Sequence, residues 1–215
     1  MNKRQSNMDS LLLKERYINY VGSLLAVVCD GVGSMSHGGV AASMAVHMLG
    51  EWFDGVSSAE LIGLKMRDAI VRINAHIISE ARIQNYETAS TLSALLLIER
   101  DFYIAHVGDS RIYQYSDDAL SPLTTDDVTD AGKLTSCIGH TEEIFMQYYE
   151  GASSGNIFLL CSDGLHKRMD AAYVAKSLGN LNKKHLSKQC ESLAHHVIER
   201  GEQDNITVAI VQVDK

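Results

Sequence analysis

Hydrophobic and polar positions change period along the chain, and the period predicts the order of strands and helices. Short apolar runs bounded by Gly, Ser, Asn or Asp predict strands over 11–13, 23–30, 91–98, 102–107, 111–115, 144–149, 157–161 and 206–213. Small and apolar residues at helical spacing predict helices over 39–53, 57–83, 171–178 and 184–199. Ser57 or Ser58 is expected to cap the second helix, and the polar stretch 117–132 is expected to be a loop.

The predicted helices come in two pairs, each placed between blocks of strands. A doubly wound parallel sheet requires strands and helices that alternate. The grouped helices of this chain therefore disfavour such a sheet. Their order favours an α+β fold in which antiparallel sheets carry helices on their outer faces. Because no repeat or linker interrupts the pattern, the sequence predicts a single domain over residues 1–215.

Composition limits the classes of function. The formal net charge of −8 disfavours a general nucleic-acid partner or an anionic membrane surface. The start of the chain, MNKRQSNMDS, has no signal-peptide core, and no apolar run approaches the ~20 residues of a membrane helix. The four cysteines form no C-x-x-C pair, and Cys29 and Cys161 lie in apolar runs, as buried free thiols do. We expect a cytoplasmic protein.

Aspartates follow or precede several of the predicted strands. Asp30, Asp109 and Asp163 each come at or just after an apolar run, and Asp204 comes just before one. Asp30-Gly31 alone fits an ordinary turn as well as a ligand site. Four such aspartates can converge at one end of stacked sheets, where their mutual repulsion requires cations. Oxygen ligands without a Cys or His cluster indicate Mg²⁺ or Mn²⁺, and two such ions can clamp a phosphoryl group.

These aspartates lie in short motifs whose order along the chain is distinctive. The motifs are Arg4-x-x-Asn7-x-Asp9, Val28-Cys29-Asp30-Gly31-Val32-Gly33, Ser90-Thr91-Leu92, Val107-Gly108-Asp109-Ser110-Arg111, Leu123-Thr124-x-Asp126, Cys161-Ser162-Asp163-Gly164-Leu165 and Asp204-Asn205-Ile206-Thr207-Val208. Each is weak alone, but the ordered set covers nearly the whole chain. By this set the chain resembles the metal-dependent protein phosphatases, the PPM or PP2C-like Ser/Thr phosphatases.

The resemblance implies a four-layer α-β-β-α sandwich with two Mn²⁺ or Mg²⁺ ions at one end. It implies that Asp30 bridges the ions, that the Gly31 carbonyl is a further ligand, and that Asp163 and Asp204 complete the first ion's site. It also implies that Asp109 and Asp163 hold a weaker third ion and that Arg4 binds the substrate phosphate. Asp9 would hold or orient metal-bound water, and Asn205 would support the metal ligands from behind. A metal-activated water would then attack phosphorus in line, and the Ser or Thr alkoxide would leave.

Several positions depart from the family pattern. Val32 stands where animal and plant members carry a proposed histidine acid, which bacterial members commonly lack. Met8 stands where Glu or Gln often lies near the second ion, and Asp127 replaces a usual His. The segment 133–139, KLTSCIG, follows almost at once where a sizeable flap usually intervenes. We therefore expect a bacterial-type member with a more open site, altered substrate choice and no flap-derived metal site.

Three functions remain open on the sequence. The first is a Ser/Thr protein phosphatase whose partners are phosphorylated protein substrates and an opposing Ser/Thr kinase. The second is a phosphatase for small phosphate esters, which the missing flap would suit. The third is a pseudophosphatase that binds phosphoproteins without turnover; Met8 is compatible with it, whereas retention of Asp30, Asp109, Asp163 and Asp204 argues against it. The oligomeric state is not indicated.

Overall fold

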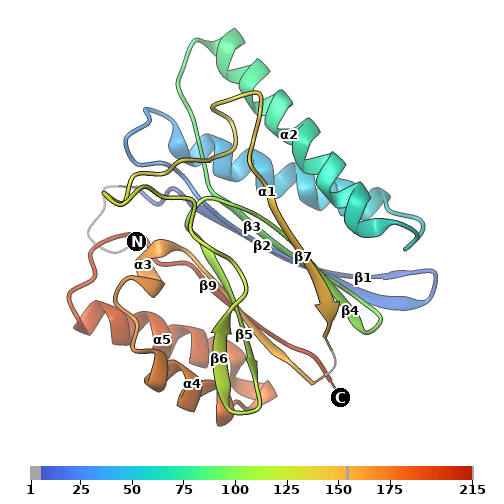
Figure 1. Cartoon of the computed structure of the whole chain (residues 1–215), viewed down its shortest axis with the longest axis vertical. Helices are drawn as coiled ribbons and strands as arrows, with labels where there is room; N and C mark the ends of the chain where they lie inside the picture. Colours follow the sequence, from blue (N-terminus) through green and yellow to red (C-terminus); the bar gives the residue numbers. More distant parts are fainter. Residues whose placement is uncertain (1–5, 154, 215) are drawn as a thin grey trace.

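The computed structural model describes residues 6–153 and 155–214, which form two antiparallel β-sheets stacked face to face (Figure 1). The five-stranded sheet has the order β1-β2-β3-β4-β7. Its strands are β1 (Asp9–Ile18), β2 (Val21–Asp30), β3 (Leu92–Ile98), β4 (Asp101–Val107) and β7 (Gln147–Ala152). The four-stranded sheet has the order β6-β5-β8-β9. Its strands are β5 (Arg111–Ser116), β6 (Ala119–Pro122), β8 (Ile157–Cys161) and β9 (Val208–Gln212).

Helices cover the outer face of each sheet. Helices α1 (Gly38–Gly55) and α2 (Ile62–Gln84) lie over the five-stranded sheet. The short α3 (Asp163–His166), α4 (Ala171–Gly179), the 3₁₀ turn η1 (Lys183–His185) and α5 (Leu186–Glu199) lie on the side of the four-stranded sheet (Figure 1). The predicted four-layer α-β-β-α sandwich is therefore confirmed.

Three apolar clusters fill the spaces between these layers. One packs α1 and α2 on the five-stranded sheet and includes Phe53 and Met66. A second lies between the sheets, where the rings of Phe102 and Phe158 meet edge to face at 5.3 Å. The third packs α4 and α5 on the four-stranded sheet. Burial of strands on both faces explains their continuous apolar runs, because such strands have no solvent side.

Several elements differ from their predicted extents; for example, β7 runs from Gln147 to Ala152 rather than over 144–149. Helix α2 begins at Ile62 rather than at 57, because Leu61 is left-handed with φ 53° and no side chain caps the helix. Strand β1 runs to Ile18, well beyond 11–13, because the tight turn at Asn19 and Tyr20 pairs it with all of β2. Strand β6 lies inside the predicted loop, where Asp117 and Asp118 take positive φ and form a hairpin turn.

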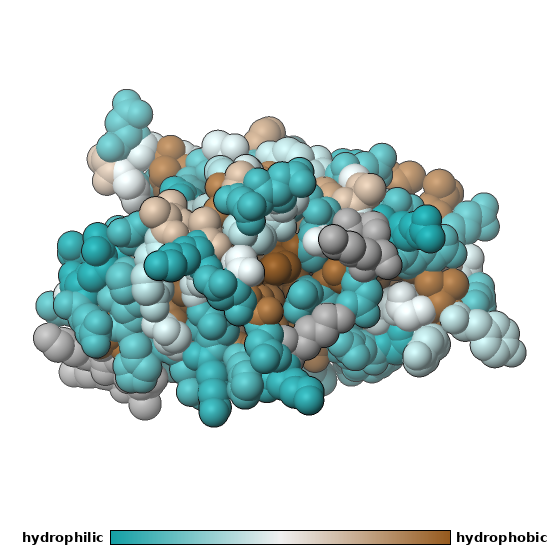
Figure 2. Space-filling model, turned by 90° about the horizontal axis from the view of Figure 1, so that it is seen from below, coloured by the Kyte–Doolittle hydropathy of each residue, from teal (hydrophilic) through white to brown (hydrophobic). Residues whose placement is uncertain are grey.

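The visible surface is mostly polar. Seen from below, it is largely hydrophilic, and hydrophobic side chains show near the middle of the view and toward its right side (Figure 2). Both predicted core thiols, Cys29 and Cys161, are fully buried and unpaired. Among the residues that the structure describes, no helix combines the length and apolar character needed to cross a membrane.

Candidate active site

The ends of several strands surround one cavity of about 740 Å³ at the edge of the sandwich. Four of the predicted aspartates line it: Asp30, Asp109, Asp163 and Asp204. Asp30 ends β2 of the five-stranded sheet, whereas Asp163 follows β8 and Asp204 precedes β9 of the other sheet. Asp109 lies in the link that carries the chain from one sheet to the other. The cavity thus collects carboxylates from both sheets.

Two hydrogen bonds with Thr91 fix the backbone of Asp30. Its N–H donates to the Thr91 hydroxyl at 2.9 Å, and its carbonyl accepts from the Thr91 N–H at 2.9 Å. Burial and the nearby charges of Asp9, Asp163 and Asp109 raise the pKa of the Asp30 carboxyl well above its usual range. Gly31 must be glycine, because a Cβ there would lie 2.5 Å from the carbonyl carbon of Gly38.

Asp9 lies directly opposite Asp30 in the β1–β2 register and does not line the cavity. Its Oδ2 accepts a hydrogen bond from the Thr207 hydroxyl at 2.7 Å, across 198 residues of sequence. Its Oδ1 is buried and has no hydrogen-bond partner in the described chain. Burial raises the pKa of Asp9, and the nearby Asp163 charge adds to the effect.

Asp109 is only 8% exposed, at the turn between β4 and β5. Burial, followed by the charge of Asp163, raises the pKa of Asp109 to about 6. Asp127 shapes this turn: its Oδ2 accepts from the Gly108 N–H at 2.9 Å, and its Oδ1 accepts from the Gln147 side-chain amide at 2.8 Å. Gly108 itself has φ +105°, which favours glycine.

Asp163 begins α3, where an acidic side chain is favoured by the helix dipole. Its Oδ2 accepts a hydrogen bond from the Lys167 ammonium group, four residues later. The Asp163 side chain is 15% exposed and that of Lys167 is 57% exposed. Burial alone would lower the pKa of Lys167. The hydrogen bond to Asp163 and the negative charges of the nearby carboxylates outweigh burial, so the pKa of Lys167 is raised. Lys167 is thus a cation placed among the cavity carboxylates.

Asn205 ties the first described residues to the last part of the chain. Its Oδ1 accepts from the Met8 N–H at 3.1 Å, across 197 residues. Its Nδ2 is buried without a hydrogen-bond partner in the described chain. The carboxylate Oδ1 of the preceding Asp204 accepts from the Asn205 N–H at 2.8 Å. Both residues line the cavity, so Asn205 is placed to orient groups bound beside Asp204.

The residues fit a divalent cation. Several carboxylates are buried close together and raise one another's pKa, and Asp9 Oδ1 has no hydrogen-bond partner in the described chain. Such a cluster of negative groups is stabilised by a bound cation. The donors are oxygen atoms, as Mg²⁺ and Mn²⁺ prefer. Within residues 6–153 and 155–214, no three His, Cys, Asp or Glu side chains form a complete metal site by themselves. Backbone carbonyls and water would have to supply the remaining ligands.

Some residues at the cavity escaped the sequence reading. Lys133, Cys137 and His140 line it from the short segment that stands in place of a flap, and Lys167 lines it from the end of α3. These residues reach the cavity through contacts between segments that are distant in sequence, which no local motif predicts. The KLTSCIG stretch contains Lys133 and Cys137, but its sequence assigns neither residue to the cavity. Arg4, the predicted phosphate ligand, lies outside the described residues, and its role stays a prediction.

Three further residues lie outside this cavity. His37 lines a neighbouring cavity, where its ring lies 4.7 Å from that of Tyr86. Arg111 forms hydrogen bonds from Nε and Nη2 to the two carboxylate oxygens of Asp126, at 2.7 and 2.8 Å, as a structural ion pair does. Burial raises the pKa of the Cys161 thiol to about 12, which suits an inert core thiol.

Known proteins share this sequence and fold. The profile of the family described as Protein phosphatase 2C matches residues 3–197. The serine/threonine protein phosphatase PstP of Mycobacterium tuberculosis is 29% identical over 239 residues, an alignment that covers 98% of the chain but 43% of PstP. The chain therefore spans less than half of that relative. Protein phosphatase PhpP of Streptococcus pneumoniae is 27% identical, with 99% of the chain and 94% of PhpP covered.

A solved structure supports the same relationship. The catalytic domain of PstP in complex with two manganese ions superposes with a TM-score of 0.82 at 25% identity, covering 99% of this chain and 94% of that one. The family profile extends from before β1 into α5 and so includes Asp30, Asp109 and Asp163. The chain belongs to the protein phosphatase 2C family.

Proposed function

We propose that the chain is a metal-dependent protein serine/threonine phosphatase, acting as a single catalytic domain in the cytoplasm. The observation that carries the proposal is the convergence of Asp30, Asp109, Asp163 and Asp204 on one cavity, where they outnumber its two lysines, Lys133 and Lys167. Its relatives PstP and PhpP carry phosphatase names, and the PstP catalytic domain binds two manganese ions. The substrates would be phosphoproteins made by an opposing Ser/Thr kinase.

In this proposal Asp30, the Gly31 carbonyl, Asp163 and Asp204, which line the cavity, would hold two Mn²⁺ or Mg²⁺ ions, and Asp109 with Asp163 would hold a weaker third. When bound, such ions activate water and neutralise the charge of the phosphoryl group. Asn205, whose Oδ1 is bonded to the Met8 N–H, keeps the Asp204 turn in place.

Two further residues would complete the site. Asp9 would hold or orient metal-bound water, and its unpartnered Oδ1 supports this role. Arg4 would bind the substrate phosphate. Positioning and electrostatic stabilisation supply most of the catalysis in phosphoryl transfer.

Hydrolysis of p-nitrophenyl phosphate tests the proposal. We expect turnover with Mn²⁺, none with EDTA, and loss of turnover in Asp30→Ala and Asp163→Ala while circular dichroism shows a folded chain. Arg4→Ala should raise KM more than it lowers kcat, because phosphate positioning is lost. Absence of Mn²⁺-dependent turnover in the purified chain would contradict the proposal and favour a pseudophosphatase.

The short segment beside the cavity favours testing a second substrate class. Residues 132–134 line the cavity where a longer flap would stand, which leaves room for small phosphate esters. Comparing kcat/KM for a phosphopeptide panel with that for small phosphorylated metabolites separates the two classes. Higher values for the metabolites would assign the chain to small esters.

A further inference from the structure

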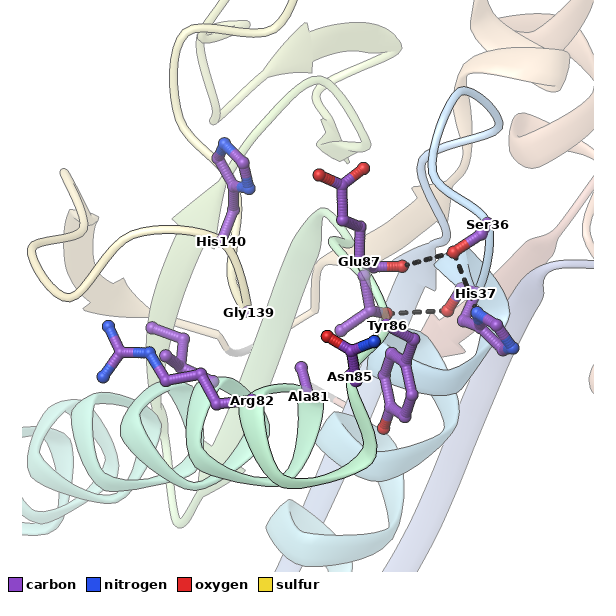
Figure 3. A pocket seen from close by; sticks show the side chains of 11 residues that line it. Ser36, His37, Ala81, Arg82, Asn85, Tyr86, Glu87, Gly139 and His140 are labelled. Atoms are coloured by element: carbon purple, nitrogen blue, oxygen red, sulfur yellow. Dashed lines mark hydrogen bonds between the residues drawn. The ribbon is translucent and has the colours of Figure 1, made fainter.

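A second cavity, of about 580 Å³, is shown in Figure 3. Helix α2 forms its floor through residues that include Ala81 and Arg82, and the segments around Glu87 and His140 rise above that helix. His140 lines both cavities. On the other side, Met35 lines the active-site cavity and the next residue, Ser36, lines the second. We call this second cavity the α2 groove.

One wall of the α2 groove is fixed to α2 by a buried side chain. Asn74, 1% exposed, accepts a hydrogen bond from the Gly139 N–H at 2.7 Å on its Oδ1. Its Nδ2 donates to the Thr141 carbonyl at 2.9 Å. These two bonds flank His140 and so hold in place the residue that lines both the groove and the active-site cavity.

The opposite wall is also held in place. The Ser36 hydroxyl and the His37 N–H both donate to the Glu87 carbonyl at 3.2 Å. The Thr88 hydroxyl donates to the His37 carbonyl at 2.6 Å, and the ring of Tyr86 lies against that of His37. Because both walls are formed before any ligand arrives, a bound segment would not have to order them.

The charge of the groove is not balanced. Arg82 forms an ion pair with Glu142 at 2.9 Å. Glu87 is exposed, its carboxylate projects above the groove on the side of His140, and it makes no ion pair with another described residue (Figure 3). Glu87 therefore leaves a negative charge beside a preformed groove that shares His140 with the candidate active-site cavity.

We propose that the α2 groove binds an extended segment of the phosphoprotein substrate next to the phosphorylated residue, and that Glu87 selects a Lys or Arg side chain in that segment. The inference rests on the proposed phosphatase function and adds to it a specificity determinant. An extended peptide suits the site because the groove continues the active-site cavity, and complementary charge fixes its register.

Steady-state kinetics with paired substrates test the proposal. A panel of phosphothreonine peptides carries a single Arg at each position from four residues before to four residues after the phosphothreonine, and a matching panel carries Glu. In the wild type, one or two Arg positions should lower KM. Glu87→Gln should remove the preference, about fivefold for an exposed pair, and Glu87→Lys should shift it to the Glu peptides.

The controls separate the groove from the chemistry. KM and kcat for p-nitrophenyl phosphate should not change in either variant, because this substrate does not reach the groove. Glu60→Gln removes another exposed carboxylate, which lies outside both cavities, and should leave peptide selectivity intact. The Arg preference should also weaken as salt rises from 50 mM to about 0.5 M, since exposed charges are screened.

Two results would overturn the proposal. One is equal peptide selectivity in the wild type and Glu87→Lys; the other is an equal loss of p-nitrophenyl phosphate and peptide turnover in Glu87→Gln. If the chain lacks turnover altogether, the phosphatase function fails, and the groove is tested by fluorescence anisotropy of the fluorescein-labelled peptides. A binding preference for Arg that Glu87→Lys reverses would then support the groove alone, and its absence would reject it.

Discussion

The Lys167 ammonium group donates a hydrogen bond to Asp163 Oδ2 and so places a positive charge where the family relationship leads us to expect a metal ion. The carboxylates of Asp109 and Asp30 also act on this ammonium group. A divalent cation that binds Asp163 must therefore displace or repel Lys167.

We predict that Lys167→Met tightens Mn²⁺ binding about threefold to tenfold, because one competing and repelling charge is removed. Titration of Mn²⁺ followed by electron paramagnetic resonance measures the affinity without substrate. Lys133→Met is the matched control, since Lys133 lines the same cavity and forms no ion pair with another described residue. An unchanged affinity in Lys167→Met would show that the ion pair does not compete.

Asp30 should lower the stability of the metal-free protein. Its carboxylate is buried beside Asp9, Asp163 and Asp109, and that arrangement disfavours the charged form. We predict that Asp30→Asn raises the free energy of unfolding in EDTA by about 1 kcal/mol while abolishing turnover, as substitutions in strained sites do. Thermal denaturation with EDTA and with Mn²⁺ measures both effects.

The metal dependence of that measurement is informative. Mn²⁺ should raise the melting temperature of the wild type and leave Asp30→Asn nearly unchanged, because the ion stabilises only the form that binds it. A wild type that melts at the same temperature with EDTA and Mn²⁺ would count against a metal site at Asp30.

The Arg111–Asp126 pair should contribute to stability. Burial alone would raise the pKa of Asp126, but its hydrogen bonds with Arg111 outweigh burial and lower that pKa. Arg111→Met leaves a half-buried carboxylate without this partner, and we expect the free energy of unfolding to fall by about 2 kcal/mol at pH 7. Urea denaturation measures it. The difference in unfolding free energy between the wild type and Arg111→Met should shrink as the pH falls below about 4, where Asp126 in the unfolded chain is protonated. A difference that stays constant with pH would contradict a stabilising Arg111–Asp126 ion pair.

His106 should make stability depend on pH. The side chain is fully buried, its Nε2 lies 3.2 Å from the Thr125 carbonyl and its Nδ1 lies 2.9 Å from the Ser93 hydroxyl. Burial lowers its pKa below the ordinary 6.5. The unfolded chain therefore takes up a proton at higher pH than the native chain, so the stability that the neutral ring contributes above about 6.5 is lost as the pH falls.

Urea denaturation of the wild type and His106→Gln in EDTA at pH 7.5 and 5.5 measures this contribution. The wild type should be the more stable at pH 7.5, and the difference should narrow at pH 5.5 by up to about 1.4 kcal/mol per pH unit of titration. Comparing the two proteins cancels the titration of the cavity carboxylates. A constant or widening difference would rule out His106 as the source.

The part of the site that the sequence predicts is the part encoded by short local motifs. Asp30, Asp109, Asp163 and Asp204 each stand at a strand boundary that their own neighbours define, so their convergence follows from the topology. Asn205 also lines the cavity, beside Asp204. The fold was predictable for the same reason, because buried strands and amphipathic helices have distinct periods.

The remainder depends on contacts that no local pattern encodes. Asp127 acts on the Gly108 N–H across 19 residues, and its role is visible only once β5 and β6 have formed between them. The predicted start of α2 was wrong, because Leu61 adopts a left-handed conformation that its residue type disfavours. Strand β6 was missed because four residues that are largely exposed carry little hydrophobic signal.

The two sheets supply the cavity in a way that also governs when it can exist. Asp9 and Met8 are synthesised well before Thr207 and Asn205, which bond to them across 198 and 197 residues of sequence. A nascent or prematurely terminated chain that ends before Asp204 would contain Asp30, Asp109 and Asp163 but would lack the fourth carboxylate of the cavity and the strand that pairs with β8. The cavity would thus be complete only after synthesis has passed β9, and shorter products should be inactive rather than weakly active.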